Sequence, residues 1–100
     1  MQVEYADDNL RRLAIDPEFR GRFPAEVVTA YWKVLNFIKR STDERDLRAW
    51  KSLHFEKLTA DLEGLHSLRL NRQWRLIIEI AGQAPNKTVV VRDVQNYHEG

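Results

Sequence analysis

Two arginines, Arg69 and Arg75, lie at equal distances from the centre of a short polar stretch, Asn71-Arg72-Gln73. The residues from Ser67 to Ile80 read SLRLNRQWRLIIEI, and this pattern of two apolar-rich flanks predicts a β-hairpin. In a hairpin with a three-residue loop, the two arginines face each other. Facing guanidinium groups repel each other unless an anion lies between or above them. The pair indicates an anionic partner, and the alternative is a solvated sheet face with its charged heads in water.

The alternation of apolar side chains selects the loop length. With a three-residue loop, Leu70 faces Trp74 and Leu68 faces Leu76, so one face of the hairpin is wholly apolar. A two-residue loop would instead place Leu68 against Arg75. Because a slip of one residue moves every side chain of a strand to the wrong face, the longer loop is predicted.

The segments before the hairpin predict the elements that position it. Met1 to Tyr5 alternates as a short strand, and Asp7-Asp8 can cap a helix that ends at Asp16-Pro17. Pro24 suits the first turn of a long helix that ends at Lys39-Arg40. Apolar side chains recur along it at helical spacing, namely Val27, Tyr31, Val34, Leu35 and Ile38. We expect this helix to cover the sheet.

The remaining segments give weaker signals. Ser41-Thr42-Asp43-Glu44 reads as a capping box that opens a short helix or turn, with Leu47 and Trp50 directed inward. From Lys51 to Gly64 the pattern is mixed, with Phe55 and Leu58 expected to be buried and a turn at Asp61 to Gly64. After the hairpin, Gly82 to Asn86 predicts a turn and Thr88 to Tyr97 a third long strand.

The order of these elements predicts an α+β fold in one domain spanning residues 1–100. It consists of an N-terminal strand, two helices and a three-stranded antiparallel meander packed on the long helix. We expect one antiparallel sheet with its Trp74, Leu76 and Ile78 face against the helix.

Composition narrows the possible functions. The 100 residues contain no cysteine, which excludes a disulfide scaffold, a thiolate zinc site and a cysteine nucleophile. No apolar run approaches the roughly 20 residues of a membrane span, and the first residues lack the basic start of a signal peptide. No Cys, His and carboxylate residues have metal-ligand spacing, so we predict neither a metal nor a cofactor. Leu65 to His98 contains five basic and two acidic residues, which favours an anionic partner. We expect a soluble, cytoplasmic protein without a membrane partner.

A set of motifs carries a family likeness. Leu58 followed by Gly64, then Ser67 to Leu76 with its Gln-Trp-Arg, and Asn96-Tyr97-His98 near the end resemble the HigB toxins of bacterial toxin–antitoxin systems. These toxins belong to the RelE/ParE superfamily and are also called plasmid-maintenance killer proteins. The likeness runs in order over nearly the whole chain, including the helix start at Phe23 to Glu26 and Asp46-Leu47.

The resemblance implies a compact fold like that of microbial ribonucleases and cleavage of mRNA on the translating ribosome. It also implies a partner, a HigA-like helix-turn-helix antitoxin, which neutralises the toxin and represses the operon by binding operator DNA as a complex. Position by position, Arg75 matches the family's phosphate-facing arginine, and Tyr97 and His98 match its C-terminal Tyr-His.

The sequence departs from the family pattern at two places. Leu58-Thr59-Ala60 stands where active relatives often have Leu-Lys-Gly, and Asn96 stands where they have an acid. Lys57 is a candidate replacement for the missing lysine. The histidine found upstream in some relatives corresponds either to His54 or to Glu56.

RNA cleavage through the 2′-hydroxyl needs a base, an acid and cations for the charge that grows on the phosphate. We expect a metal-independent endoribonuclease in which Arg75 binds the phosphate, Tyr97 positions the substrate, and His98, or else His54, transfers protons. Supporting RNA contacts are expected from Arg69, Arg72, Lys57, Lys87 and Arg92. By contrast, His66 faces the apolar side of the hairpin and is expected to be a half-buried histidine at the sheet edge.

Two other functions stay open. One is a ParE-like protein that inhibits DNA gyrase by binding without cleaving anything, and the terminal Tyr-His argues against it. The other is a weakened toxin that acts mainly through antitoxin binding and operon repression, which Thr59-Ala60 and Asn96 favour.

Overall fold

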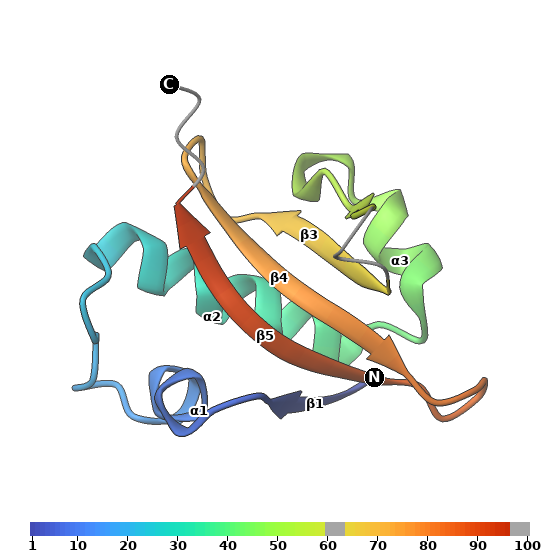
Figure 1. Ribbon diagram of the computed structural model, residues 1–100, viewed down its shortest axis with the longest axis horizontal. Helices are drawn as coiled ribbons and strands as arrows, with labels where there is room; N and C mark the ends of the chain where they lie inside the picture. Colours follow the sequence, from blue (N-terminus) through green and yellow to red (C-terminus); the bar gives the residue numbers. More distant parts are fainter. Residues whose placement is uncertain (60–63, 97–100) are drawn as a thin grey trace.

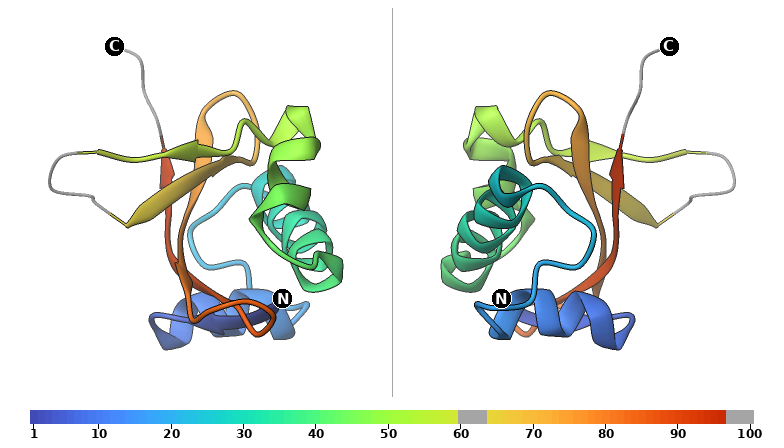
Figure 2. Two further views of the ribbon diagram at one scale, coloured as in Figure 1. Left: turned by 90° about the vertical axis from the view of Figure 1, so that its right-hand side faces the viewer. Right: turned by 90° about the vertical axis from the view of Figure 1, so that its left-hand side faces the viewer.

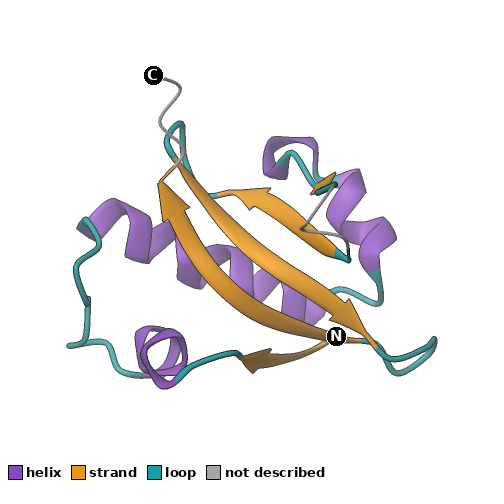
Figure 3. Cartoon of the chain, in the orientation of Figure 1, coloured by secondary structure: helices purple, strands orange, loops and turns teal. Residues whose placement is uncertain are grey.

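The three α-helices of the described chain lie in its first half, whereas most of the strands lie in its second half (Figures 1 and 3). The structure is a computed structural model, and it describes residues 1–59 and 64–96. In chain order the elements are β1 (Gln2–Tyr5), α1 (Asp8–Ile15), α2 (Ala25–Arg40), α3 (Glu44–Ala49), a short 3₁₀ helix η1 (Lys51–Leu53), β2 (Glu56–Lys57), β3 (Leu65–Arg69), β4 (Trp74–Ala81) and β5 (Thr88–Asn96). The predicted α+β fold is therefore confirmed.

The strands form one sheet in the order β1-β5-β4-β3-β2. The predicted antiparallel meander is present as β3, β4 and β5. The expectation of a wholly antiparallel sheet is wrong at one edge, where β1 pairs parallel with β5 and Gln2 lies opposite Thr88. A parallel pair needs a long crossover connection, and here the helices and the meander supply it. The two-residue strand β2 was not predicted, because so short a segment carries no recognisable alternation.

Helix α2 covers one face of the sheet, and Figure 2 shows α2 and α3 on this same side. The core between the layers includes Tyr31 and Ile38 from α2 and Leu76 and Ile78 from β4, none of which is exposed to solvent. The expected core face of the hairpin is therefore confirmed. At its end, Trp74 packs edge to face on Phe23, just before α2, with ring centroids 5.5 Å apart.

Two side chains of α2 fasten α1 to the core. The Tyr31 hydroxyl donates a hydrogen bond to the Leu10 carbonyl at 2.8 Å, and the Trp32 indole N–H donates to the Leu13 carbonyl at 2.7 Å. Burial raises the pKa of Tyr31, so the hydroxyl keeps its proton and remains a donor. These bonds tie the main chain of α1, at Leu10 and Leu13, to α2.

The helix starts follow the sequence signals with one exception. Asp7 caps α1 by accepting a hydrogen bond from the Leu10 amide at 2.8 Å, as predicted. The predicted capping box with Ser41 as the cap is wrong. Asp43 caps α3 instead, accepting from the Arg45 amide at 2.9 Å, while the Ser41 hydroxyl donates to the Phe37 carbonyl at 2.8 Å. The position after α2 thus serves the end of that helix and not the start of the next.

A bulge in β5 shifts its alternation. Ile77 lies opposite Asp93 but Ile78 lies opposite Val91, so one residue, Arg92, is inserted. Because of this insertion both Val91 and Val94 face the core, although they are three positions apart. The rest of β5, up to Asn96, keeps its register beside the start of β4.

Candidate active site

Leu70 pairs with Trp74 just beyond the end of β3, which leaves the three-residue loop, Asn71 to Gln73, that the sequence predicts. The Leu70 amide donates to the Trp74 carbonyl at 2.9 Å, and Leu68 lies opposite Leu76. Arg69 consequently lies opposite Arg75 on the face of the sheet that points away from α2. The predicted register is confirmed, and it places two cations side by side.

The two arginines share one acceptor. The Arg69 Nε donates to the main-chain oxygen of Asn71 at 3.3 Å, and the Arg75 Nη1 donates to the same oxygen at 3.0 Å. Arg75 Nη1 also lies 3.3 Å from the Trp74 carbonyl oxygen. Both side chains are half-buried. A carbonyl oxygen between the two guanidinium groups offsets part of their repulsion and holds them together.

His54, which follows η1, contacts this pair through Arg69. Its backbone φ is 47°, and its amide donates to the Lys51 carbonyl at 3.1 Å. Such a left-handed backbone is uncommon for a residue other than glycine. The His54 Nε2 lies 3.2 Å from Arg69 Nη1. Because a guanidinium can only donate, this contact is a hydrogen bond only when the His54 Nε2 carries the lone pair that accepts it.

Arg69 and Arg75 lie on the sheet face that no described helix covers, which we call the arginine face (Figure 2). Ser67 and Ile77 lie opposite each other on it, and both are buried. Next to Arg75 on β5 lies Gln95, whose amide Nε2 donates to the Asp93 carboxylate at 3.0 Å. The result is a cationic end of a sheet face with a histidine at one border and an oriented amide at the other. Two guanidinium groups side by side offer the charge and the donors that suit a phosphate.

A family model described as "RelE-like toxin of type II toxin-antitoxin system HigB" matches residues 3–97. The chain belongs to this family. A relative of the HigB-like chain, Toxin HigB-1 of Vibrio cholerae serotype O1 (strain ATCC 39315 / El Tor Inaba N16961), is 30% identical over 79 residues, which cover 79% of this chain and 83% of the relative. The resemblance inferred from the hairpin and the terminal motif is therefore confirmed.

Two solved structures share the fold of this HigB-like toxin at low sequence identity. A YoeB/ParE toxin from Agrobacterium tumefaciens matches with a TM-score of 0.62 at 16% identity, over 98% of this chain and 100% of its own. YafQ from E. coli strain BL21(DE3) matches with a TM-score of 0.64 at 9% identity, over 95% of this chain and 91% of its own. As a toxin of a type II system, the HigB-like chain has an antitoxin as its partner.

The other predicted RNA-binding cations of the toxin lie in different places. Lys57 pairs in register with His66, so strand alternation puts it on the helix side of the sheet, whereas its neighbour Glu56 lies opposite Ser67 on the arginine face. Lys87 lies at the far end of the sheet, 2.6 Å from Glu44 in an ion pair. These positions separate Lys57 and Lys87 from the arginine pair.

Arg72 and Arg92 lie closer to the arginine face. Arg72 is exposed within the hairpin loop. Arg92, the inserted residue of the bulge, lies 3.6 Å from Glu79 in an exposed ion pair. The roles of all four cations in RNA binding stay predictions.

The family's Tyr-His pair, Tyr97 and His98, lies outside the described residues. Asn96, the residue before it, pairs with Trp74, directly after the hairpin loop. Of the two departures from the family pattern, Thr59 is exposed and Ala60 lies outside the described residues. The catalytic roles predicted for Arg75, Tyr97, His98 and His54 stay predictions.

His66 is half-buried, as the sequence predicts, but its expected place at the sheet edge is wrong, because Lys57 of β2 pairs beside it. Its ring stacks on Phe55 with centroids 4.8 Å apart and planes 6° apart. Burial lowers the pKa of His66, the nearby cations Arg48 and Lys57 lower it further, and Glu44 opposes them. Its Nδ1 is buried without a hydrogen-bond partner. This histidine packs as an aromatic ring on the core side, away from the arginine pair.

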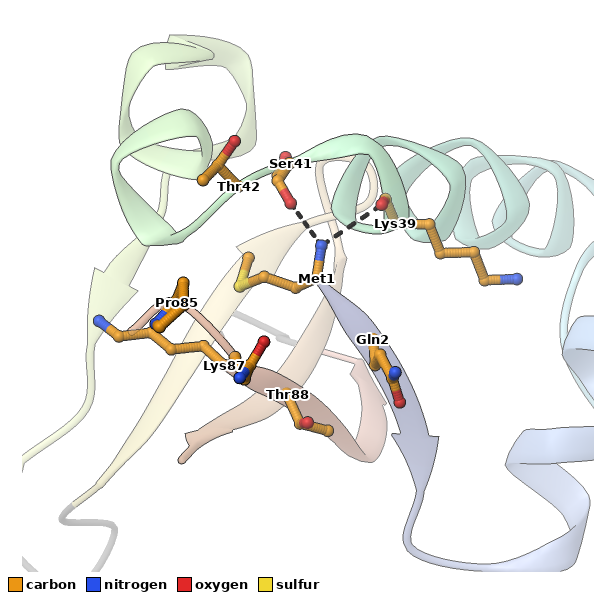
Figure 4. Close-up of a pocket in the computed structure, with 9 residues that line it drawn as sticks. Met1, Gln2, Lys39, Ser41, Thr42, Pro85, Lys87 and Thr88 are labelled. Carbon is orange, nitrogen blue, oxygen red and sulfur yellow. Dashed lines mark hydrogen bonds between the residues drawn. The ribbon is translucent and has the colours of Figure 1, made fainter. Parts of the chain in front are cut away.

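One surface pocket lies away from the arginine pair. Figure 4 shows it between β1, the end of α2 and the β4–β5 turn, with Lys39, Ser41, Pro85 and Lys87 among its lining residues. The amino group of Met1 donates to the carbonyl oxygens of Lys39 and Ser41 there.

Two absences concern the described residues, 1–59 and 64–96. No helix among them is long and apolar enough to cross a membrane. No group of three His, Asp or Glu side chains among them could hold a metal ion.

Two residues of the site were missed in the sequence. Asn71 was read only as part of a polar loop, although asparagine often bonds the backbone two residues ahead and could have been recognised by that tendency. Gln95 lies opposite Arg75 only because of the bulge in β5, and no sequence pattern predicts that bulge.

Proposed function

We propose that this HigB-like toxin is an endoribonuclease that cleaves mRNA on the translating ribosome in the cytoplasm, and so inhibits translation. The observation that supports the proposal is that Arg69, Arg75 and His54 lie together, linked by hydrogen bonds, at the arginine face. A phosphodiester is a monoanion that becomes more negative as a fifth oxygen bonds to phosphorus. Two guanidinium groups beside it stabilise that added charge.

The proposed reaction is transesterification within the RNA. The 2′-oxygen attacks phosphorus, the bond to the 5′-oxygen breaks, and a 2′,3′-cyclic phosphate remains on one product. We assign proton removal from the 2′-hydroxyl to His54, whose Nε2 can take that proton once Arg69 turns from it to the phosphate. His98 then protonates the leaving 5′-oxygen, and Tyr97 stacks on a base or donates to the phosphate.

The proposed partner is a HigA-like helix-turn-helix antitoxin, and the toxin–antitoxin complex represses its own operon by binding operator DNA. The toxin expressed alone should stop growth, whereas co-expression with the antitoxin should give a soluble, inactive complex. Expression of the toxin without the antitoxin, with no effect on growth, would contradict this assignment.

The decisive experiment combines growth inhibition with mapping of mRNA 5′ ends in cells that express the toxin. Inhibition with new 5′ ends inside translated messages is the expected result. Inhibition without any cleavage would favour the gyrase-binding alternative. Binding of the antitoxin with neither inhibition nor cleavage would favour a weakened toxin, for which Thr59-Ala60 and Asn96 are the sequence basis.

A further inference from the structure

Five hydrogen bonds converge on Asn71 in the hairpin loop. Its side-chain Oδ1 accepts from the Gln73 and Trp74 amides, both at 2.9 Å, and its own amide donates to the Trp74 carbonyl at 3.4 Å. Its main-chain oxygen accepts from Arg69 and Arg75 at 3.3 Å and 3.0 Å. One residue therefore closes the loop with its side chain and collects both guanidinium groups with its backbone.

We infer that Asn71 is a positioning residue of the active site, whose side chain turns its main-chain oxygen toward the two arginines and fixes their orientation. This inference rests on the proposed phosphate-binding role of Arg75. Asn71 itself contacts no substrate in this scheme. It acts through Arg69 and Arg75.

The physical basis is the electrostatic repulsion between Arg69 and Arg75 and the conformational freedom of their side chains. Facing arginines repel each other and have long, flexible stems, so in isolation they would splay apart into water. A carbonyl oxygen has two lone pairs and can accept from both at once. Bringing the two groups together before RNA binds removes an ordering cost from the binding step and keeps the phosphate in one place.

The alternative is that Asn71 only stabilises the turn. In that case its loss would weaken the hairpin without any specific link to Arg75. A double-mutant cycle separates the two roles, because residues that act together show non-additive effects whereas independent ones add.

The test compares Asn71→Ala with Asn71→Ser, which differ by one oxygen atom; a serine hydroxyl can make the same contact more weakly. Cleavage of a defined message on translating ribosomes is measured at a temperature where all variants are folded. We expect Asn71→Ala to slow cleavage roughly 10- to 100-fold, as expected for a displaced catalytic group, and Asn71→Ser to restore part of it. Gln73→Ala, in the same loop, removes an exposed side chain and should leave the rate unchanged.

In the Arg75→Ala background the further effect of Asn71→Ala should shrink to about threefold or less, because one of the groups it positions is gone. An equal loss in both backgrounds would overturn the inference, as would full activity of Asn71→Ala beside an impaired Arg75→Ala. Full activity of Arg75→Ala alone would instead refute the proposed function. The two failures are thus distinguishable.

A measurement on the unmodified toxin covers the case in which Asn71→Ala does not fold. Nitrogen relaxation of arginine side chains by NMR should show the Arg69 Nε–H nearly as ordered as the backbone, with an order parameter near 0.85, and the exposed Arg72 below about 0.6. Equal mobility of the two side chains would overturn the inference.

Discussion

Replacing Arg75 by alanine should separate activity from stability. In the proposed reaction Arg75 stabilises charge that develops only in the transition state. Loss of one such donor slows catalysis roughly 10²- to 10³-fold, which corresponds to about 2.7–4 kcal/mol. Arg75→Lys should recover only part of this, because an ammonium lacks the planar fork that binds two phosphate oxygens.

The stability of the same variant should change little. Arg75 is half-buried and bonds two carbonyl oxygens, those of Asn71 and Trp74, but it also faces another cation. Lost hydrogen bonds cost about 1 kcal/mol each and relief of repulsion returns some tenths, so we expect a net loss of about 1 kcal/mol. For a domain of this size that corresponds to a Tm lower by roughly 4–8 °C.

The assay is the rate of message cleavage on translating ribosomes, with thermal unfolding measured on the same preparations. Arg45→Ala is the matched control, because this exposed arginine of α3 pairs with Asp43 outside the arginine face. Arg45→Ala should cleave at the normal rate. Normal cleavage by Arg75→Ala would refute the placement of the phosphate, and a Tm loss far above 8 °C would show that Arg75 acts mainly as a structural residue.

Three further predictions follow from contacts in the fold. Tyr31→Phe leaves the Leu10 carbonyl without its buried donor and should lower the free energy of unfolding by about 1–3 kcal/mol, measured by urea denaturation. The pKa of His66 is lowered in the folded state, so the unfolded chain binds the proton of this histidine more tightly. The stability should therefore be greatest at a pH above the ordinary pKa of histidine, fall as the pH drops through that value, and level off below the pKa of the folded state. Comparing Tm against pH for the native chain and His66→Gln checks this, and identical profiles would contradict it. Deleting residues 97–100 removes Tyr97 and His98 but keeps the core, whose described residues end at Val94. Circular dichroism should therefore show a folded protein, and a growth assay should show that it no longer inhibits growth.

The local elements were predictable because each carries its own signal. The long helix was found within one residue at its start, since Pro24 and the helical spacing of Val27, Tyr31 and Val34 mark one buried stripe. The hairpin register followed from the need to keep Leu68 and Leu76 on one face. These are effects of neighbours in sequence or across a tight loop.

Features set by distant contacts were not predictable. The parallel pairing of β1 depends on where β5 returns, and no residue in either strand specifies a direction. The face of Lys57 depends on β2, a two-residue strand without a sequence signal. The role of Asn71 could have been suspected from its side chain, but its bonds to Arg69 and Arg75 use the backbone, which every residue has.

The place of β5 inside the sheet sets the order in which this toxin can fold during its synthesis. The strand lies between β1 and β4, and it is the last strand of the described chain to be synthesised. Until it emerges, β1 has no partner and β4 has one open edge, so the sheet cannot close during most of translation at about 5–20 residues per second. The pairing of Gln2 with Thr88 also joins residues far apart in the sequence, and contacts of such long separation form slowly. A nascent toxin therefore spends most of its synthesis without the complete sheet, and an antitoxin already present has that interval in which to meet an incompletely folded chain.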